Sequence, residues 1–135
     1  MSFWASQTSQ CQFDYGASGA LYGPARSLLA FDRALLEGEL LTDDARATLW
    51  TGMPEFGFVA LGQWSFSAPL EGCDGAVRII ERRGDVGSIQ ARNILLPDQD
   101  LSVIVFTTNA RFDFGAIWTG SGFSHDLLRA AACPS

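Results

Sequence analysis

Apolar positions in the first half of the chain repeat with the period of an α-helix. The stretch from Pro24 to Glu37 starts with a proline suited to a first helical turn and is followed by Gly38, a common helix stop. Its larger apolar residues fall on one helical face: Leu28, Phe31, Leu35 and Leu36. The spacing therefore predicts an amphipathic helix over 24–37.

A second, shorter helix is expected directly after the first. Thr42 suits an N-cap, Asp43 and Asp44 favour the positive end of the helix dipole, and Gly52 lies just beyond the expected end.

From residue 56 the apolar pattern changes to a period of two. Gly, Pro and Asp clusters separate four such runs, which are Phe56 to Phe66, Ala76 to Arg82, Ser88 to Leu96 and Leu101 to Thr108. Short links between them predict an antiparallel meander. The last run is apolar on both faces, so packed elements are expected on both sides, as for a central strand. A broken helical stretch over 112–132, interrupted around Gly120 and Gly122, closes the chain.

These elements predict an α+β fold in which helices pack on a sheet of about four antiparallel strands. The chain has 135 residues, of which 47% are apolar and 18% charged, and this length and composition fit a single folded domain. We divide it into an N-terminal segment (1–14), a helical part (15–55), the strands (56–109) and a C-terminal helical segment (110–135). The four Trp and ten Phe residues are spread at core spacings, which favours core packing over an aromatic binding site.

Charge and the basic residues exclude several function classes. The net charge is −6, and all nine basic residues are arginines without a cluster, so no nucleic-acid partner is predicted. The absence of lysine excludes a lysine general base, a Schiff base and a phosphate-loop lysine.

Cysteine and histidine give no metal pattern. Cys11, Cys73 and Cys133 are odd in number and far apart, although a pair such as Cys11 with Cys133 would bridge the two ends. His125 lies between Ser124 and Asp126, but adjacent helical residues diverge, so we expect a surface or half-buried histidine instead of a relay. Together with Cys133 it gives only two ligands, and neither a metal nor a cofactor is predicted.

The first residues predict neither export nor membrane insertion. Met1 to Gln12 has no positive n-region and no long apolar run, so we interpret it as a chain start and expect no membrane partner. The cellular compartment stays open.

Four segments, in order, resemble the C-terminal part of penicillin-recognising serine hydrolases, the family of class C β-lactamases, serine esterases and penicillin-binding proteins. The resemblance covers about residues 15 to 110. The segments are Ala17–Leu28, Leu35–Leu41, Phe56–Trp64 and Leu95–Asn109. It implies a partial β-lactamase-like (transpeptidase-like) fold. Some members of that family are periplasmic or secreted and others are cytoplasmic.

The resemblance places the family's Lys-Thr-Gly or His-x-Gly motif on Arg82-Arg83-Gly84, with its following glycine on Gly87. In the family this strand lines the active site, and its glycine lets substrate approach the backbone. Its cation attracts the substrate carboxylate or orients the proton network of the nucleophile. An amide after that glycine supplies half of the oxyanion hole, and Asp85 holds the matching position. The implied substrate-binding residues are therefore Arg82, Gly84, Asp85 and Gly87.

Two features set limits on this assignment. A carboxylate at Asp85 is unfavourable near developing negative charge unless it points away. Arg82 and Arg83 alternate in direction, so one cleft takes at most one of them, and we choose Arg82. The alternative for Arg82 is a solvated arginine paired with Glu81 or Asp85.

No Ser-x-x-Lys nucleophile pair is present, because the chain has no lysine, and no catalytic residue is assigned. Two functions remain open. One is a fragment or subunit of a β-lactamase or esterase-type serine hydrolase that is inactive alone. The other is a non-catalytic binding or assembly protein that has kept the sheet and lost the chemistry.

The predicted partners follow from the sheet and from Arg82. In the resembled fold the sheet continues beyond the strand Leu101 to Thr108, and this strand carries no charge or proline to block pairing. We therefore expect a homodimer or a missing N-terminal partner chain at this edge. An anionic small molecule is the ligand that Arg82 would hold.

Overall fold

The computed structural model describes residues 5–6 and 21–133, and it has an α+β fold. Three helices, α1 (Ala25–Leu36), α2 (Asp43–Leu49) and α3 (Phe123–Ala132), accompany a four-stranded antiparallel sheet. The strands run in the order β3 (Trp64–Pro69), β4 (Ala76–Val86), β5 (Ile89–Leu96) and β6 (Leu101–Thr107), which confirms the predicted meander. The remaining short elements are β1 (Ala5–Ser6), β2 (Leu21–Tyr22) and the 3-10 helices η2 (Pro54–Phe56), η3 (Pro97–Gln99) and η4 (Ile117–Thr119).

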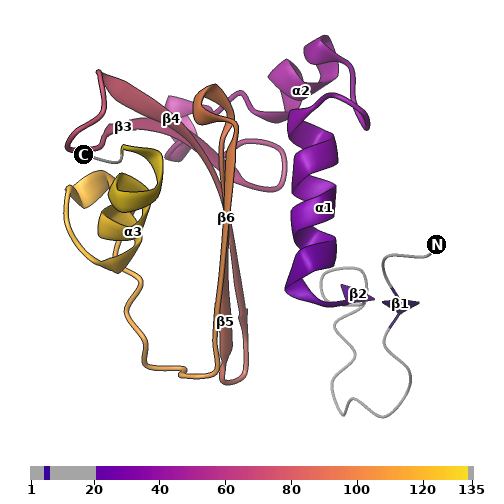
Figure 1. Cartoon of the computed structure of the whole chain (residues 1–135), viewed down its shortest axis with the longest axis vertical. Helices are drawn as coiled ribbons and strands as arrows, with labels where there is room; N and C mark the ends of the chain where they lie inside the picture. Colours follow the sequence, from indigo (N-terminus) through magenta and orange to yellow (C-terminus); the bar gives the residue numbers. More distant parts are fainter. Residues whose placement is uncertain (1–4, 7–20, 134–135) are drawn as a thin grey trace.

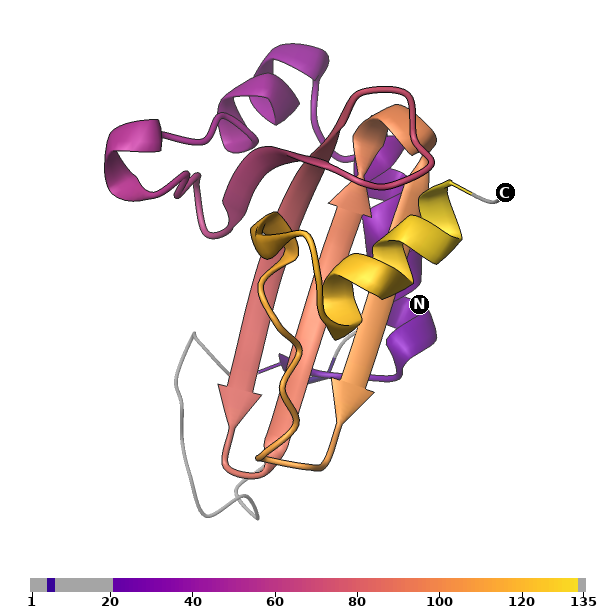
Figure 2. The same ribbon diagram turned by 90° about the vertical axis from the view of Figure 1, so that its left-hand side faces the viewer.

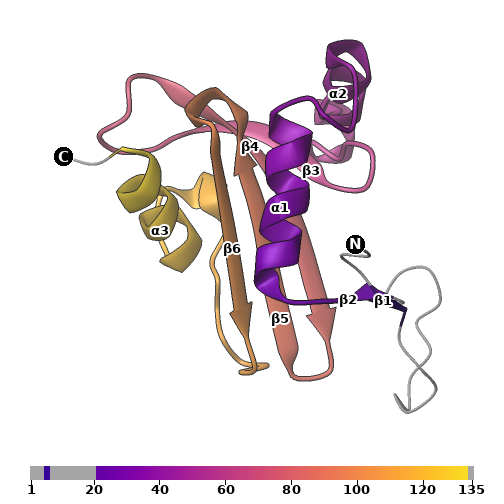
Figure 3. The ribbon, with the colours of Figure 1, turned by 45° about the vertical axis from the view of Figure 1, so that its right-hand side comes forward.

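Helices pack on both faces of the sheet. Figure 1 shows the sheet nearly edge-on, with α1 on one side and α3 on the other. Figure 2 looks onto the face that α3 and the preceding loop cover. Figure 3 shows α1 lying along the opposite face, next to β5 and β6. We call these the α3 face and the α1 face of the sheet.

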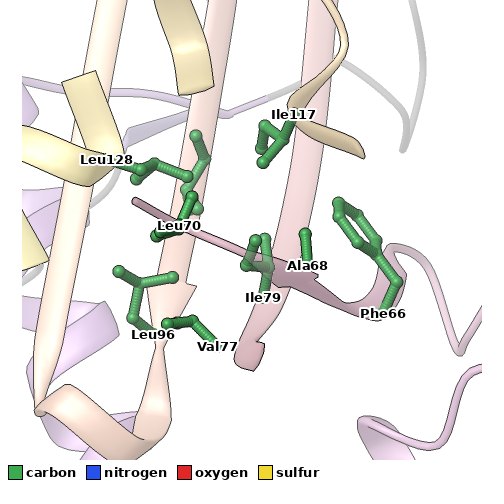
Figure 4. Packing of buried hydrophobic residues seen from close by; sticks show 9 residues of the cluster. Phe66, Ala68, Leu70, Val77, Ile79, Leu96, Ile117 and Leu128 are labelled. Atoms are coloured by element: carbon green, nitrogen blue, oxygen red, sulfur yellow. The ribbon is translucent and has the colours of Figure 1, made fainter. Parts of the chain in front are cut away.

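The larger core lies on the α3 face. It comprises Phe66, Ala68, Leu70, Val77, Ile79, Ile94, Leu96, Ile117 and Leu128 (Figure 4). Ile79, Leu96, Ile117 and Leu128 have no exposed surface. Burying side chains of this size contributes about 1.5–3 kcal/mol each relative to leaving them in water, so this cluster anchors α3 to the sheet.

A smaller core lies on the α1 face, where Leu35, Trp50, Ile80 and Leu95 are buried together. The predicted face of α1 is partly wrong, because Phe31 is 46% exposed and Asp32 is buried instead. Asp32 lies four residues after Leu28 and three before Leu35, so it belongs to the same face as these leucines, whereas Phe31 lies at the edge of that face. Thr42 caps α2 as expected, since its hydroxyl accepts a hydrogen bond from the Ala45 amide at 3.3 Å.

The strand predicted over 56–66 begins only at Trp64. Gly57 and Phe58 both have left-handed backbones, with φ of 67° and 63°, and these conformations turn the chain out of a strand. β4, in contrast, extends four residues beyond the predicted Arg82, to Val86.

Packed elements cover both faces of β6, as its apolar pattern predicts. Leu101 and Val103 pack against the larger core, and the Ser102 hydroxyl donates a hydrogen bond to Asp32 of α1. Within residues 21–133, however, β6 pairs with β5 alone and is therefore an edge strand and not a central one. Figure 1 shows no other strand beside it.

A disulfide joins Cys73, in the connection between β3 and β4, to Cys133 at the end of α3. The suggested pairing of Cys133 with Cys11 is therefore wrong, and Cys11 lies outside the described residues. The two Cα atoms are 5.1 Å apart, within the usual range for a disulfide. The bond fastens α3 to the end of the sheet that its apolar face already covers.

No helix in the described part of the chain has the length and apolar character needed to cross a membrane.

Candidate functional site

The far half of β4 has a free edge. The last residue of β4 that pairs with β3 is Glu81, opposite Trp64, whereas pairing with β5 continues to Val86. In the described part of the chain, Arg82–Val86 thus has a neighbouring strand on one side only, and Figure 2 shows this half of the hairpin extending past β3. The motif identified in the sequence lies on this free segment.

Arg82 and Gly84 lie together on the α1 face. Arg82 pairs with Asn93 of β5, which hydrogen-bonds to α1, and Gly84 pairs with Ala91 in the next row. Arg82 is exposed, and its side chain forms no ion pair or hydrogen bond with residues 21–133. Among the described residues, a Cβ atom at Gly84 would meet only the Ala91 Cβ, at 3.5 Å, so these residues leave the backbone open to an approaching molecule.

Asp85 and Gly87 do not join this pair. Side chains alternate along β4, so Asp85 lies on the α3 face, away from Arg82. In this orientation the Asp85 carboxylate does not repel an anion bound at Arg82. Gly87 forms the two-residue turn to β5 with Ser88, and its φ of 64° suits glycine at this tight turn.

A buried carboxylate on α1 supports the site from behind. Asp32 accepts hydrogen bonds from the Asn93 side-chain amide at 2.9 Å and from the Ser102 hydroxyl at 2.6 Å. Burial raises the pKa of Asp32 above its ordinary value of 3.8, and these two hydrogen bonds oppose that rise. Asp32 thus fixes the orientation of Asn93 beside Arg82. The predicted face of this helix was defined by its apolar residues alone, so the role of Asp32 was not predicted.

A second polar cluster lies on the α3 face of the same strands. Glu81 has no exposed surface, and its Oε2 accepts a hydrogen bond from the Arg83 guanidinium at 2.8 Å. The Nε of Arg92 lies 3.5 Å from the other oxygen, an ion pair without hydrogen-bond geometry. Burial lowers the pKa of Arg92, and the charge of Glu81 opposes that change. Glu81 therefore pairs with Arg83 and Arg92 and not with Arg82, which was the alternative considered from the sequence.

Aromatic rings enclose these two arginines. The Arg83 guanidinium lies 5.1 Å from the Trp64 ring centroid and 5.0 Å from that of Trp118, and Arg92 lies 4.3 Å from the Phe114 centroid. These distances are within the range of cation–π attraction. Strand alternation separated Arg83 from Arg82 correctly, but no local pattern predicts that Trp118, 35 residues later, reaches Arg83.

His125 is buried, and the expectation of a surface or half-buried histidine is wrong. Its Nδ1 atom lies 3.1 Å from Asp126 Oδ1, and Ser124 beside it is also buried. The Ser124 amide donates to the Phe114 carbonyl, which shows that this turn of α3 packs against the loop before η4. Among residues 21–133, no three His, Cys, Asp or Glu side chains gather to hold a metal ion.

Comparisons with known proteins found no matching family model, no matching curated protein and no matching solved structure.

Proposed function

We propose that this chain forms the C-terminal sheet of a β-lactamase or esterase-type serine hydrolase and has no turnover alone. The observation that carries the proposal is the placement of Arg82 and Gly84 on one face of a strand segment with a free edge. A cation beside an open backbone on an edge strand suits a substrate carboxylate. The chain has no lysine to activate a serine, so the nucleophile pair would come from another chain or segment.

The test of inactivity is covalent labelling of the isolated chain. We expect no adduct with a fluorescent penicillin or a p-nitrophenyl ester by intact mass, because acylation needs an activated hydroxyl. A stoichiometric acyl adduct would overturn the proposal, and the modified serine would identify the nucleophile.

Anion binding at Arg82 has its own test. Titration with a small carboxylate should show weak, salt-sensitive binding that Arg82→Ala abolishes, because the arginine is exposed and its attraction is screened by ions. Arg111→Ala, another exposed arginine, is the matched control. Equal affinity of the chain and Arg82→Ala would remove Arg82 from the site.

We propose further that β6 pairs with another strand. In the described part of the chain its outer edge is unpaired, and no residue of Leu101–Thr107 is charged, so a second copy would meet no like-charge repulsion. The alternative is that β6 pairs with a strand of a missing partner chain. Sedimentation at micromolar concentration should show a dimer. A monomer whose amides from Val103 to Phe106 are protected from exchange would contradict pairing with a second copy and also pairing with a partner chain.

The second candidate function is a non-catalytic binding or assembly protein, and the open edge of β6 is the observation that favours it. The flanking DNA separates the two functions. A neighbouring reading frame that encodes Ser-x-x-Lys would support the hydrolase, and its absence would support the binding protein.

A further inference from the structure

A groove lined by aromatic side chains opens at the outer edge of β3, on the side of the molecule where η4 lies. Its volume is about 340 Å³, within the range of small-molecule sites. Four aromatic residues, one serine and one glycine line it: Phe58, Trp64, Phe66, Trp118, Ser67 and Gly57. The spacing of the aromatic residues along the sequence predicted core packing, but Phe58 is 45% and Trp118 55% exposed.

The walls of this groove are held in place by backbone hydrogen bonds and ring contacts. The Ser65 amide donates to the Phe58 carbonyl at 2.9 Å, which fixes the 57–58 turn to the edge of β3. Phe66 and Trp118 meet edge to face, with ring centroids 5.5 Å apart. Phe58 keeps a left-handed backbone that disfavours a bulky residue, and its ring lines the groove from that position. A preformed wall reduces the entropy lost when a ligand binds.

A partly exposed cation, Arg83, lies beside two of the residues that line the groove. Trp64 and Trp118 both line it, and the Arg83 guanidinium lies within about 5 Å of both ring centroids. Behind Arg83, the buried carboxylate of Glu81 pairs with both Arg83 and Arg92, and the charge of Asp85 also acts on Arg92. The Nε atoms of both arginines are buried without a hydrogen-bond partner in the described part of the chain. Asp85, the next acid on this face, lies farther along β4 from Trp64.

We propose that this groove binds a small aromatic carboxylic acid, with its ring among the aromatic side chains and its carboxylate at Arg83. The aromatic walls select a planar apolar group through stacking and edge-to-face contacts. The arginine selects the acid because a charge-assisted hydrogen bond beside low-dielectric walls is stronger than one in water. This site lies on the α3 face and is separate from Arg82 on the α1 face, so it does not depend on the proposed hydrolase function.

The experiment is a titration with 3-phenylpropionate and, separately, with the uncharged 3-phenylpropionamide. Calorimetry gives the affinities, and two-dimensional NMR follows the indole N–H signals of Trp64 and Trp118. We expect the carboxylate to bind at least about ten-fold more tightly than the amide and to shift both indole signals. Equal affinity for the two would overturn the assignment to an acid. Indole signals that stay unchanged at saturation would overturn the site.

Substitution gives a second test. Trp118→Ala should weaken phenylpropionate binding at least about ten-fold, because it removes one wall of the groove and the ring over Arg83. The matched control is Phe106→Ala, which removes a ring of similar exposure from the α1 face. If both variants bind as the unmodified chain does, the groove is not the site. The NMR shifts in the unmodified chain decide the question if Trp118→Ala does not fold.

Discussion

The hairpin formed by β4 and β5 has two halves that differ in the strands and side chains next to them. The closed half, Val77–Ile80 with Ile94–Leu96, lies beside β3, and its apolar side chains are buried on both faces. The open half, Arg82–Val86 with Ile89–Arg92, extends past β3 and leaves Val86 and Ile89 about half exposed. Backbone pairing with β3 therefore distinguishes the halves, and so does the packing of side chains against their faces.

Glu81 stands at the boundary between the two halves, as the last residue of β4 that pairs with β3. It is fully buried like its apolar neighbours but pairs with arginines that extend into the open half. The comparison suggests that the closed half supplies the stability of the fold, whereas side chains of the open half can change at little cost.

The largest effect is expected from Glu81→Ala. Removing this carboxylate leaves Arg83 and Arg92 without their buried counter-charge, and breaking a buried pair in this way costs about 3–5 kcal/mol. Asp85→Ala, on the same face of the same strand but exposed, should change the stability little. Urea unfolding measures both. Similar losses of unfolding free energy for the two variants would show that Glu81 contributes no more to stability than Asp85 does.

A direct test of the two halves compares Leu96→Ala with Ile89→Ala. Leu96 has no exposed surface, so its truncation should cost about 2–5 kcal/mol through lost burial and a cavity. Ile89 is 50% exposed, and its truncation should cost less than about 1 kcal/mol. The midpoints of urea unfolding decide this, and equal losses would contradict the division into a closed and an open half.

The smallest effect concerns pH and Asp32, which links α1 to the open half. Because burial raises the pKa of Asp32 in the fold above 3.8, the folded chain binds this proton more tightly than the unfolded chain. The contribution of Asp32 to stability is therefore full at low pH and falls as the pH rises from about 3.8 through the raised pKa.

The corresponding measurement compares the unmodified chain with Asp32→Asn, which keeps a similar shape without the charge. Between pH 7 and pH 4 the unmodified chain should gain stability relative to Asp32→Asn. Parallel stability curves across this range would contradict the raised pKa. Asp32→Ala should cost about 1–3 kcal/mol, since it leaves the Asn93 amide and the Ser102 hydroxyl unpaired.

Much of the fold could be predicted from local patterns. The period of two and the Gly-Pro-Asp clusters identified the sheet, and the N-cap at Thr42 located α2. Patterns failed where tertiary contacts decide the outcome. Periodicity could not show that Asp32 finds hydrogen-bond partners 61 and 70 residues away and so replaces Phe31 in the interior. The start of β3 was missed because Phe58, a good strand residue, adopts a left-handed backbone.

The candidate site was predictable only in part, for a similar reason. Alternation alone separates Arg82 from Arg83 and turns Asp85 away. The pairing of Glu81 with two arginines depends on the register of β5, and the position of Trp118 depends on how the chain returns over the sheet. Neither of these two features can be predicted from the local sequence.

The disulfide between Cys73 and Cys133 closes a ring that contains β4, β5 and β6, since the two cysteines are separated by 60 residues. The exposed turn at Gly87 and Ser88 lies within that ring. A protease that cuts the chain once at this turn would therefore release no fragment. On a denaturing gel the cut protein would migrate as one covalent species, and two bands would appear only after a thiol reductant opens the ring.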